Sequence, residues 1–120
     1  MMLEGVLYEV VSREEGSAAV RLLPDSPVYA AHFPGYPITP GVTIVQMALE
    51  LMGRKLSAAK DIKFVEPVLP SPSGTILRFT WTFPEPERAD VNVYLEEETL
   101  CSKMVLSVAP AGREMETTES

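Results

Sequence analysis

The middle of the chain carries one strongly apolar helix signal, which constrains the fold more than any other feature. Thr39 followed by Pro40 marks a helix start, because a hydroxyl can cap free backbone amides and proline is favoured at the first helical position. The apolar residues that follow cover most of the circumference of a helix: Val42, Ile44, Val45, Met47, Ala48, Leu49, Leu51, Met52 and Leu56. We therefore predict one long helix that is buried on nearly all sides.

Six shorter apolar runs are typical of β-strands, and polar turns or proline-containing loops separate them. The runs cover residues 3–12, 17–23, 61–65, 75–83, 91–95 and 100–108. Strands in this number around a single apolar helix predict the α+β class, with a curved antiparallel sheet wrapped around the helix. We expect residues 1–109 to form one domain and residues 110–120 to form a polar, disordered tail.

Charge, hydropathy and cysteine content limit the partners and the cellular compartment that we expect for this chain. The net charge of -7 argues against binding of a nucleic-acid backbone. No apolar run approaches the ~20 residues that cross a bilayer, and the single cysteine, Cys101, cannot form a disulfide framework, so we expect a cytoplasmic protein that binds no membrane. Since the edges of a sheet need partners, we expect a homodimer or a higher even oligomer formed by edge pairing.

Basic residues gather in one short stretch of this acidic chain. They are Arg54, Lys55, Lys60 and Lys63. The stretch fits a docking patch for an acidic partner such as an acyl carrier protein. It also fits a solvated helix end whose cations offset the helix dipole.

His32 is the only histidine, which excludes sites that need several imidazoles, such as HExxH zinc sites. The chain also lacks a GxSxG elbow, a P-loop and a GxGxxG turn, and no metal or cofactor is implied. His32 precedes a proline-dense loop that leads to the helix, so we expect it near the helix start. The alternative is a structural histidine held in a loop.

The expected helix start itself has a chemical use. The first amides of a helix are unpaired and lie at the positive end of its dipole. Gly41 has no side chain and would let a thioester carbonyl approach these amides closely. An oxyanion or enolate would be stabilised at this place.

The segment from the histidine to the helix resembles the signature of the 3-hydroxyacyl-[acyl-carrier-protein] dehydratases of fatty acid synthesis. The matching residues are His32-Phe33-Pro34-Gly35, Pro37 and Pro40-Gly41-Val42, followed by Lys63-Phe64, Pro67-Val68 and Pro70. The resemblance spans roughly residues 30–74.

This resemblance implies a hot-dog-fold dimer in which the histidine of one subunit faces a helix carboxylate of the other across an acyl tunnel. His32 would remove the proton alpha to the thioester, and the Gly41 N–H would hold the carbonyl oxygen. Phe33, Pro40 and Val42 would contribute to substrate binding. The substrate would be a thioester of acyl carrier protein or coenzyme A.

One position departs from the family pattern. The family places a Glu or Asp six residues after the start of its Pro-Gly pair, where this chain has Gln46, and glutamine cannot donate a proton as a general acid. The family commonly has Glu and then Gln one turn later, whereas this chain has Gln46 and then Glu50. Glu50 would serve as the acid if the substrate were shifted by a turn, about 6 Å along the helix. The alternative is that Glu50 forms an ordinary ion pair with Arg54.

Three functions are compatible with these residues. The first is a dehydratase, or reverse hydratase, of fatty acid or lipid biosynthesis, with His32 as base and with Glu50, or a water held by Gln46, completing the proton path. The second is an acyl thioesterase in which Gln46 and Glu50 position water. The third is a non-catalytic subunit that binds an acyl group or a carrier protein and has lost its acid.

Overall fold

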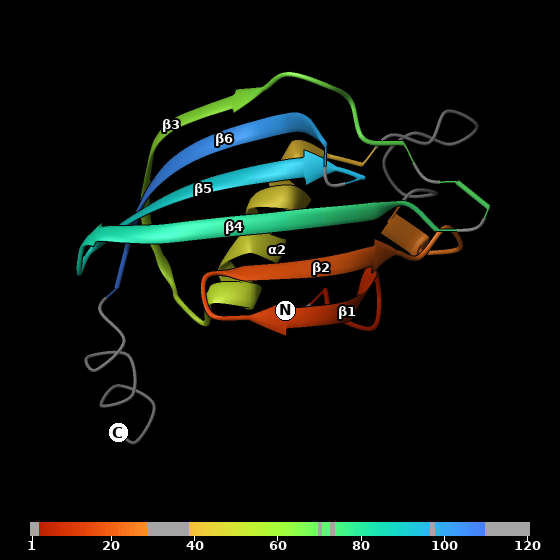
Figure 1. The fold of residues 1–120 in the computed structure, drawn as a ribbon, viewed down its shortest axis with the longest axis horizontal. Coiled ribbons are helices and arrows are strands. Elements are labelled where there is room, and N and C mark those ends of the chain that lie inside the picture. The colour runs from red at the N-terminus through yellow and green to blue at the C-terminus, as the bar shows by residue number, and fades with distance from the viewer. Residues whose placement is uncertain (1–2, 29–38, 70, 73, 97, 110–120) are drawn as a thin grey trace.

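The computed structural model describes residues 3–28, 39–69, 71–72, 74–96 and 98–109, and its main feature is one antiparallel six-stranded sheet (Figure 1). The strands are β1 (Tyr8–Glu14), β2 (Ser17–Leu22), β3 (Leu56–Phe64), β4 (Ile76–Glu85), β5 (Arg88–Leu95) and β6 (Thr99–Val108). Their order in the sheet is β1-β2-β4-β5-β6-β3, so β1 and β3 form the two edges. The predicted antiparallel sheet is confirmed.

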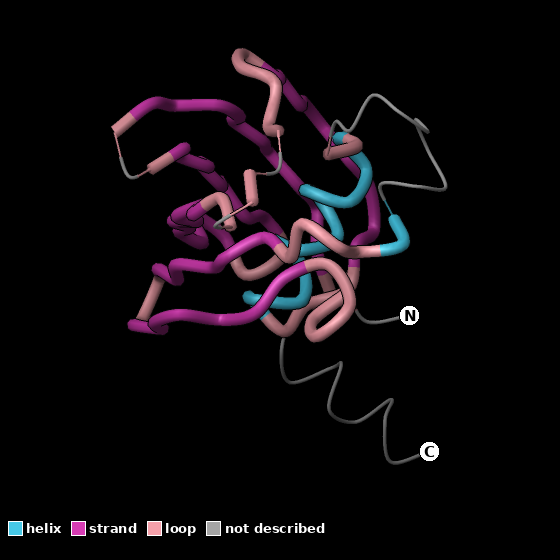
Figure 2. Tube along the Cα trace, turned by 90° about the vertical axis from the view of Figure 1, so that its right-hand side faces the viewer, coloured by secondary structure: helices cyan, strands magenta, loops and turns pink. Residues whose placement is uncertain are grey.

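The helix α2 (Gly41–Met52) lies within the curve of the sheet, behind the strands in Figure 1 and again on one side of them in Figure 2. Side chains that alternate along β4, β5 and β6 point inward to meet it, as the twofold repeat of a strand requires. The buried core joins residues of the helix to residues of four strands: Ile44, Met47, Ala48, Leu51, Val20, Leu22, Leu77, Phe79, Val91, Val93, Met104 and Leu106. A sheet curved around one helix is therefore confirmed.

The prediction of a long helix is wrong, because α2 has 12 residues and ends at Met52. Gly53 follows with a left-handed φ of 69°, and its N–H donates to the carbonyl oxygens of Leu49 and Glu50. A glycine in this conformation stops a helix and satisfies its last carbonyls. Leu56, which the apolar pattern assigned to the helix, is the first residue of β3.

The start and the burial of α2 also differ from the prediction. Pro40 is the N-cap residue rather than the first helical one, and no side chain of the described residues caps the start of the helix. Thr39 lies before the cap, where its N–H donates to the Val68 carbonyl oxygen at 2.8 Å. Val42 is 70% exposed, so burial on nearly all sides is wrong for the single chain.

No helix in the described ranges is long and apolar enough to cross a membrane. The expected tail, residues 110–120, lies outside the described residues.

Two phenylalanines of β4 allow a matched test of the core. Phe79 is fully buried, whereas Phe83 is exposed and lies under the Arg54 guanidinium, 4.1 Å from its ring centroid. We expect Phe79→Ala to lower the free energy of unfolding by about 3–5 kcal/mol, because it leaves a cavity in the core. Phe83→Ala should lower it by about 1 kcal/mol, since it removes an exposed cation–π contact. Urea denaturation of both variants measures the difference, and equal losses would contradict this core.

Candidate active site

The start of α2 places three of the predicted substrate-binding residues, Pro40, Gly41 and Val42, beside the end of β3. A Cβ atom added at Gly41 would lie 2.6 Å from Cζ of Phe64, so the Phe64 ring rests on this glycine. Close approach of the ring is a structural reason for glycine here, separate from the carbonyl-binding reason that the sequence suggests. Phe64 is itself exposed on its other side.

The first amides of α2 are available in the part of the chain that the structure describes. The N–H groups of Thr43 and Ile44 donate to the Pro40 carbonyl oxygen at 3.0 and 3.3 Å, and the Thr43 hydroxyl donates to the same oxygen at 2.6 Å. The amides of Gly41 and Val42 have no acceptor among the described residues. These two amides can therefore donate to an external oxygen at the positive end of the helix dipole.

Two predicted site residues, His32 and Phe33, lie outside the described residues, as does Pro70 of the motif. Thr39, the first described residue after this gap, donates its N–H to the carbonyl oxygen of Val68 in the segment after β3. The motif residues on both sides of this bond, Gly41 and Phe64, are in contact.

Gln46 and Glu50 face each other along α2. The Gln46 Nε2 donates to Oε2 of Glu50 at 2.9 Å. A carboxylate only accepts hydrogen bonds, so the amide atom next to it must be the NH₂ group. The orientation of the Gln46 amide is thus fixed by chemistry.

Glu50 accepts three further hydrogen bonds from the beginning of the chain. Its Oε2 accepts from the backbone N–H of Leu3 at 2.7 Å, and its Oε1 accepts from the N–H of Glu4 at 3.1 Å and from the Tyr8 hydroxyl at 2.8 Å. Each carboxylate oxygen therefore has two donors. Glu50 attaches the N-terminal segment to the helix, which sequence reasoning did not predict.

Tyr8 is fully buried at the start of β1. Desolvation raises the pKa of its hydroxyl well above the usual value, and the hydrogen bond to the Glu50 carboxylate raises it further. The tyrosine is therefore a stable donor to Glu50. Its place in an alternating apolar run signals burial, but nothing in the sequence identifies its partner.

The i,i+4 ion pair between Glu50 and Arg54 is not formed among the described residues. Arg54 Nη1 instead donates to the carbonyl oxygens of Pro86 and Ala109, both at 3.2 Å. Arg54 thus holds the β4–β5 turn and the end of β6 together. This alternative interpretation of Glu50 is wrong.

The other three basic residues of the stretch, Lys55, Lys60 and Lys63, are exposed. Lys60 and Lys63 belong to β3, and the last turn of α2 has no basic residue. The interpretation of the patch as a helix end is therefore wrong, because Lys60 and Lys63 lie on an edge strand and not at the end of α2.

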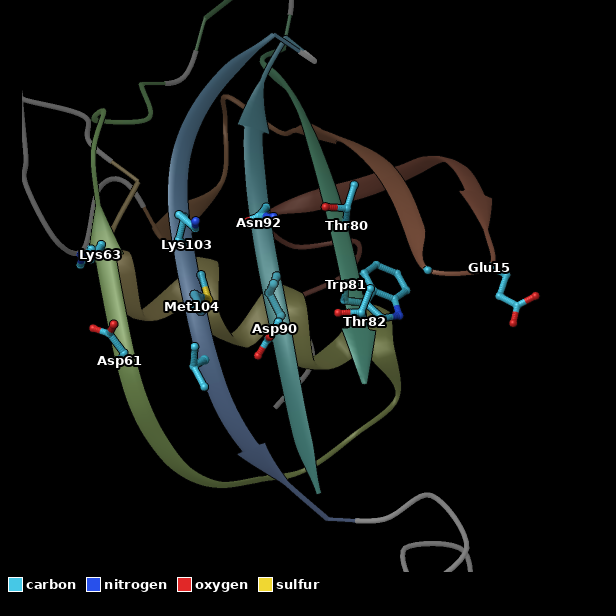
Figure 3. Close-up of a pocket in the computed structure, with 13 residues that line it drawn as sticks. Glu15, Asp61, Lys63, Thr80, Trp81, Thr82, Asp90, Asn92, Lys103 and Met104 are labelled. Carbon is cyan, nitrogen blue, oxygen red and sulfur yellow. The ribbon is translucent and has the colours of Figure 1, made fainter. Parts of the chain in front are cut away.

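A hollow of about 750 Å³ lies on the outer face of the sheet, with α2 behind the strands (Figure 3). One row of polar side chains crosses it in strand register: Lys63, Lys103, Asn92 and Thr80. Asp61 and Asp90 line it one step further along. The hollow has no α2 residue in its lining, so it is separate from the helix start.

Among the described residues, no three His, Cys, Asp or Glu side chains are grouped so that they could hold a metal ion. Cys101 is buried, and desolvation raises the pKa of its thiol. A buried thiol of this kind acts as core packing.

Comparison with solved structures establishes the hot-dog fold. The HP0420-homologue from Helicobacter felis is 16% identical with a TM-score of 0.59, and the match covers 88% of this chain and 89% of that one. A hypothetical thioesterase protein with coenzyme A from Streptococcus pneumoniae TIGR4 is 13% identical, with a TM-score of 0.56 and coverage of 86% and 89%. The dehydratase domain from the CurK module of curacin polyketide synthase is 15% identical, with a TM-score of 0.58 and coverage of 88% and 44%.

Comparison of the sequence identifies the family. No curated protein matches the sequence significantly. The family model named ApeI-like, described as ApeI dehydratase, matches residues 9–104 and so includes the motif, the helix and all but the ends of the sheet. Because this match covers well over half of the 120 residues, the chain belongs to the ApeI-like dehydratase family.

Proposed function

We propose that the protein removes water from 3-hydroxyacyl thioesters in fatty acid or lipid biosynthesis. The observation that carries this proposal is the ApeI-like dehydratase match over residues 9–104, which runs through the whole motif. The backbone amides of Gly41 and Val42, which have no acceptor among the described residues, support it, because a thioester oxygen needs donors of this kind when charge develops on it.

The chemistry we propose begins with His32, which takes the proton from the carbon alpha to the thioester. The Gly41 N–H holds the carbonyl oxygen of the resulting enolate. The electron pair then forms the carbon–carbon double bond, and the carbon–oxygen bond to the 3-hydroxyl breaks. A water held by Gln46 carries the proton from the imidazolium of His32 to the departing hydroxyl, so that enoyl thioester and water are released and His32 is neutral again.

Two alternatives rest on specific observations. A thioesterase is supported by the solved relative of the same fold that is named a hypothetical thioesterase with coenzyme A. A non-catalytic binding subunit is supported by Gln46, since an amide cannot protonate a leaving group.

One assay separates the three functions. We expect the wild-type protein to form enoyl product from a 3-hydroxyacyl thioester without releasing thiol, and His32→Ala to lower kcat by about 10²- to 10⁴-fold, because a general base contributes this much. Absorbance of the enoyl thioester and a thiol reagent follow both products in the same sample. Thiol release without enoyl product would identify a thioesterase, and binding without either product would identify a subunit that has lost its activity.

We further propose that a second copy pairs along the β3 edge. The exposed large apolar residues are concentrated on and just after this strand, at Leu56, Phe64, Val65 and Leu69. None of the nine residues of β3 is buried in the single chain. An edge strand with this much exposed apolar surface needs a cover, and a second β3 provides one by continuing the sheet.

Opposite edges of the sheet provide a matched test of this dimer. Val65 follows β3 and is 57% exposed, whereas Val11 on β1 is 52% exposed. We expect Val65→Asp to produce monomers, because a carboxylate would be desolvated in the interface, and Val11→Asp to leave the dimer intact. Light scattering at micromolar concentration measures the mass. A dimer that is lost only in Val11→Asp would place the interface on the β1 edge and would contradict this proposal.

The exposed lysines beside β3 are our proposed docking site for an acyl carrier protein, with Arg54 contributing through its half-exposed position. We expect Lys55→Glu with Lys60→Glu to raise KM for a carrier-protein substrate about tenfold at low salt, because the substrate carrier is acidic and rim charges steer association. The KM for the matching coenzyme A thioester should stay unchanged. Arg21→Glu with Arg88→Glu makes the same charge change at exposed positions of β2 and β5 and is the charge-matched control. An equal effect of both double variants on both substrates would contradict a carrier-specific patch.

A further inference from the structure

Two neighbouring rows of side chains cross the outer face of the sheet, and they differ in charge. The register of β3, β6, β5 and β4 places in one row Lys63, Lys103, Asn92 and Thr80. It places in the other row Asp61, Val105, Asp90 and Thr82. The rows are two residues apart along each strand, so both lie on the same face, where they line the hollow (Figure 3). We call them the lysine row and the aspartate row.

The single chain leaves three charges of these rows without an opposite charge. Lys63 and Lys103 are exposed and lie directly opposite each other on β3 and β6, where like charges destabilise a sheet. Neither lysine forms an ion pair with any residue in the described ranges, and neither does Asp61. Asp90 differs, because the Arg88 Nε donates to its Oδ1 at 2.9 Å. Both lysines and Asp61 are therefore available to a partner.

We propose that this partner is a second copy of the chain, packed with its outer face against the outer face of the first. A twofold axis that runs between the two rows and parallel to them reverses the direction of the strands. It places the lysine row of one copy over the aspartate row of the other. Lys63 then faces Asp61 of the second copy, and Asn92 faces Asp90 of the second copy. Each pair forms twice, because a twofold contact is isologous.

The position of Lys103 agrees with this axis. Lys103 faces Val105 of the second copy, which lies between Asp61 and Asp90 in the aspartate row. Its apolar stem covers the valine while its ammonium reaches a carboxylate on either side. A twofold axis along the strands would instead place both lysines over Asn92 and Thr80, with no carboxylate opposite. The charge pattern therefore selects the axis that runs along the rows.

The shape of the face allows this packing. Two sheets pack about 10 Å apart when their strands run within about 30° of each other, and reversed strands meet this condition. The hollow of about 750 Å³ gives the lysine side chains of the facing copy room, and bridging water completes a polar contact of this kind. The β3 edge stays open for edge pairing. Both contacts together give a tetramer, and this inference does not depend on the proposed reaction.

Sedimentation of the full chain tests the contact. Exposed ion pairs each contribute little, so we expect face pairing at sub-millimolar concentration, well above the micromolar range of the edge dimer. The wild-type mass in about 0.1 M NaCl should be twice the mass in about 1 M NaCl, because the Debye length falls from about 10 Å to about 3 Å. The apolar edge dimer should persist in both. An equal mass at the two salt concentrations would overturn the inference.

A charge exchange tests the predicted axis. Asp61→Lys and Lys63→Asp each place like charges across it, so each should abolish the doubled mass in low salt. The double variant Asp61→Lys with Lys63→Asp restores opposite charges at unchanged net charge, and it should regain the doubled mass. Lys55→Glu makes the same charge change as Lys63→Asp outside the hollow and should keep the doubled mass. Failure of the double variant to recover, or loss in Lys55→Glu, would overturn the inference.

A variant away from the β3 edge separates the face contact from the edge contact. Lys103 lies on β6, inside the sheet, so its charge does not belong to the edge. We expect Lys103→Glu to abolish the doubled mass in low salt, because it places a carboxylate between Asp61 and Asp90 of the facing copy. The edge dimer at micromolar concentration should remain. If Lys103→Glu keeps the doubled mass while the β3 variants lose it, the charges act at the edge and the inference is wrong.

Discussion

Four hydrogen bonds converge on one carboxylate, that of Glu50, and they join parts of the chain that are distant in sequence. Two backbone amides, at Leu3 and Glu4, and the Tyr8 hydroxyl approach it from the N-terminal side, and Gln46 approaches it from one turn earlier in the helix. A half-buried charge is tolerated only when its lone pairs are satisfied, and the amides would in turn lack acceptors without it. The helix, the N-terminal segment and β1 therefore depend on each other through this group. The orientation of the amide next to the candidate site follows from the same bonds.

Local patterns predicted the sheet and the existence of the helix, because alternation in the strands and a dense apolar run are properties of neighbouring residues. They failed at Leu56, since the apolar repeat of the helix continues in phase with the first residue of β3. Only three residues separate the two elements, and the first of them, Gly53, is the left-handed residue that ends the helix. The partners of Glu50 could not be predicted. The N–H of Leu3 lies 47 residues away in sequence, and a backbone amide leaves no trace in the residue type. Arg54 illustrates the same limit, because its acceptors at Pro86 and Ala109 become neighbours only after the sheet has curled.

The candidate site and the exposed edge of the sheet share one residue, Phe64. Its ring packs on Gly41 at the helix start, and it is also the last residue of β3, where it stays exposed in the single chain. Val42, on the open side of the helix start, is 70% exposed. A partner that covered Phe64 on the β3 edge would therefore also lie beside the helix start. The outer face of the sheet differs from this edge, because it carries the charged and polar row of Lys63, Lys103, Asn92 and Thr80.

This chain has Gln46 and then Glu50 along α2, where the family commonly has Glu and then Gln. This order also changes the electrostatic field at the helix start. The negative charge stands at Glu50, about 6 Å further from the Gly41 amide than a charge at position 46 would be. Four donors compensate it at the more distant position. An enolate held by the Gly41 N–H would be repelled by a nearby carboxylate, and this repulsion weakens with distance and with local hydrogen bonding. If the protein works as the dehydratase we propose, this arrangement would favour negative charge on the substrate oxygen. It would also need a proton carrier other than the Gln46 amide, which has no acidic proton to give.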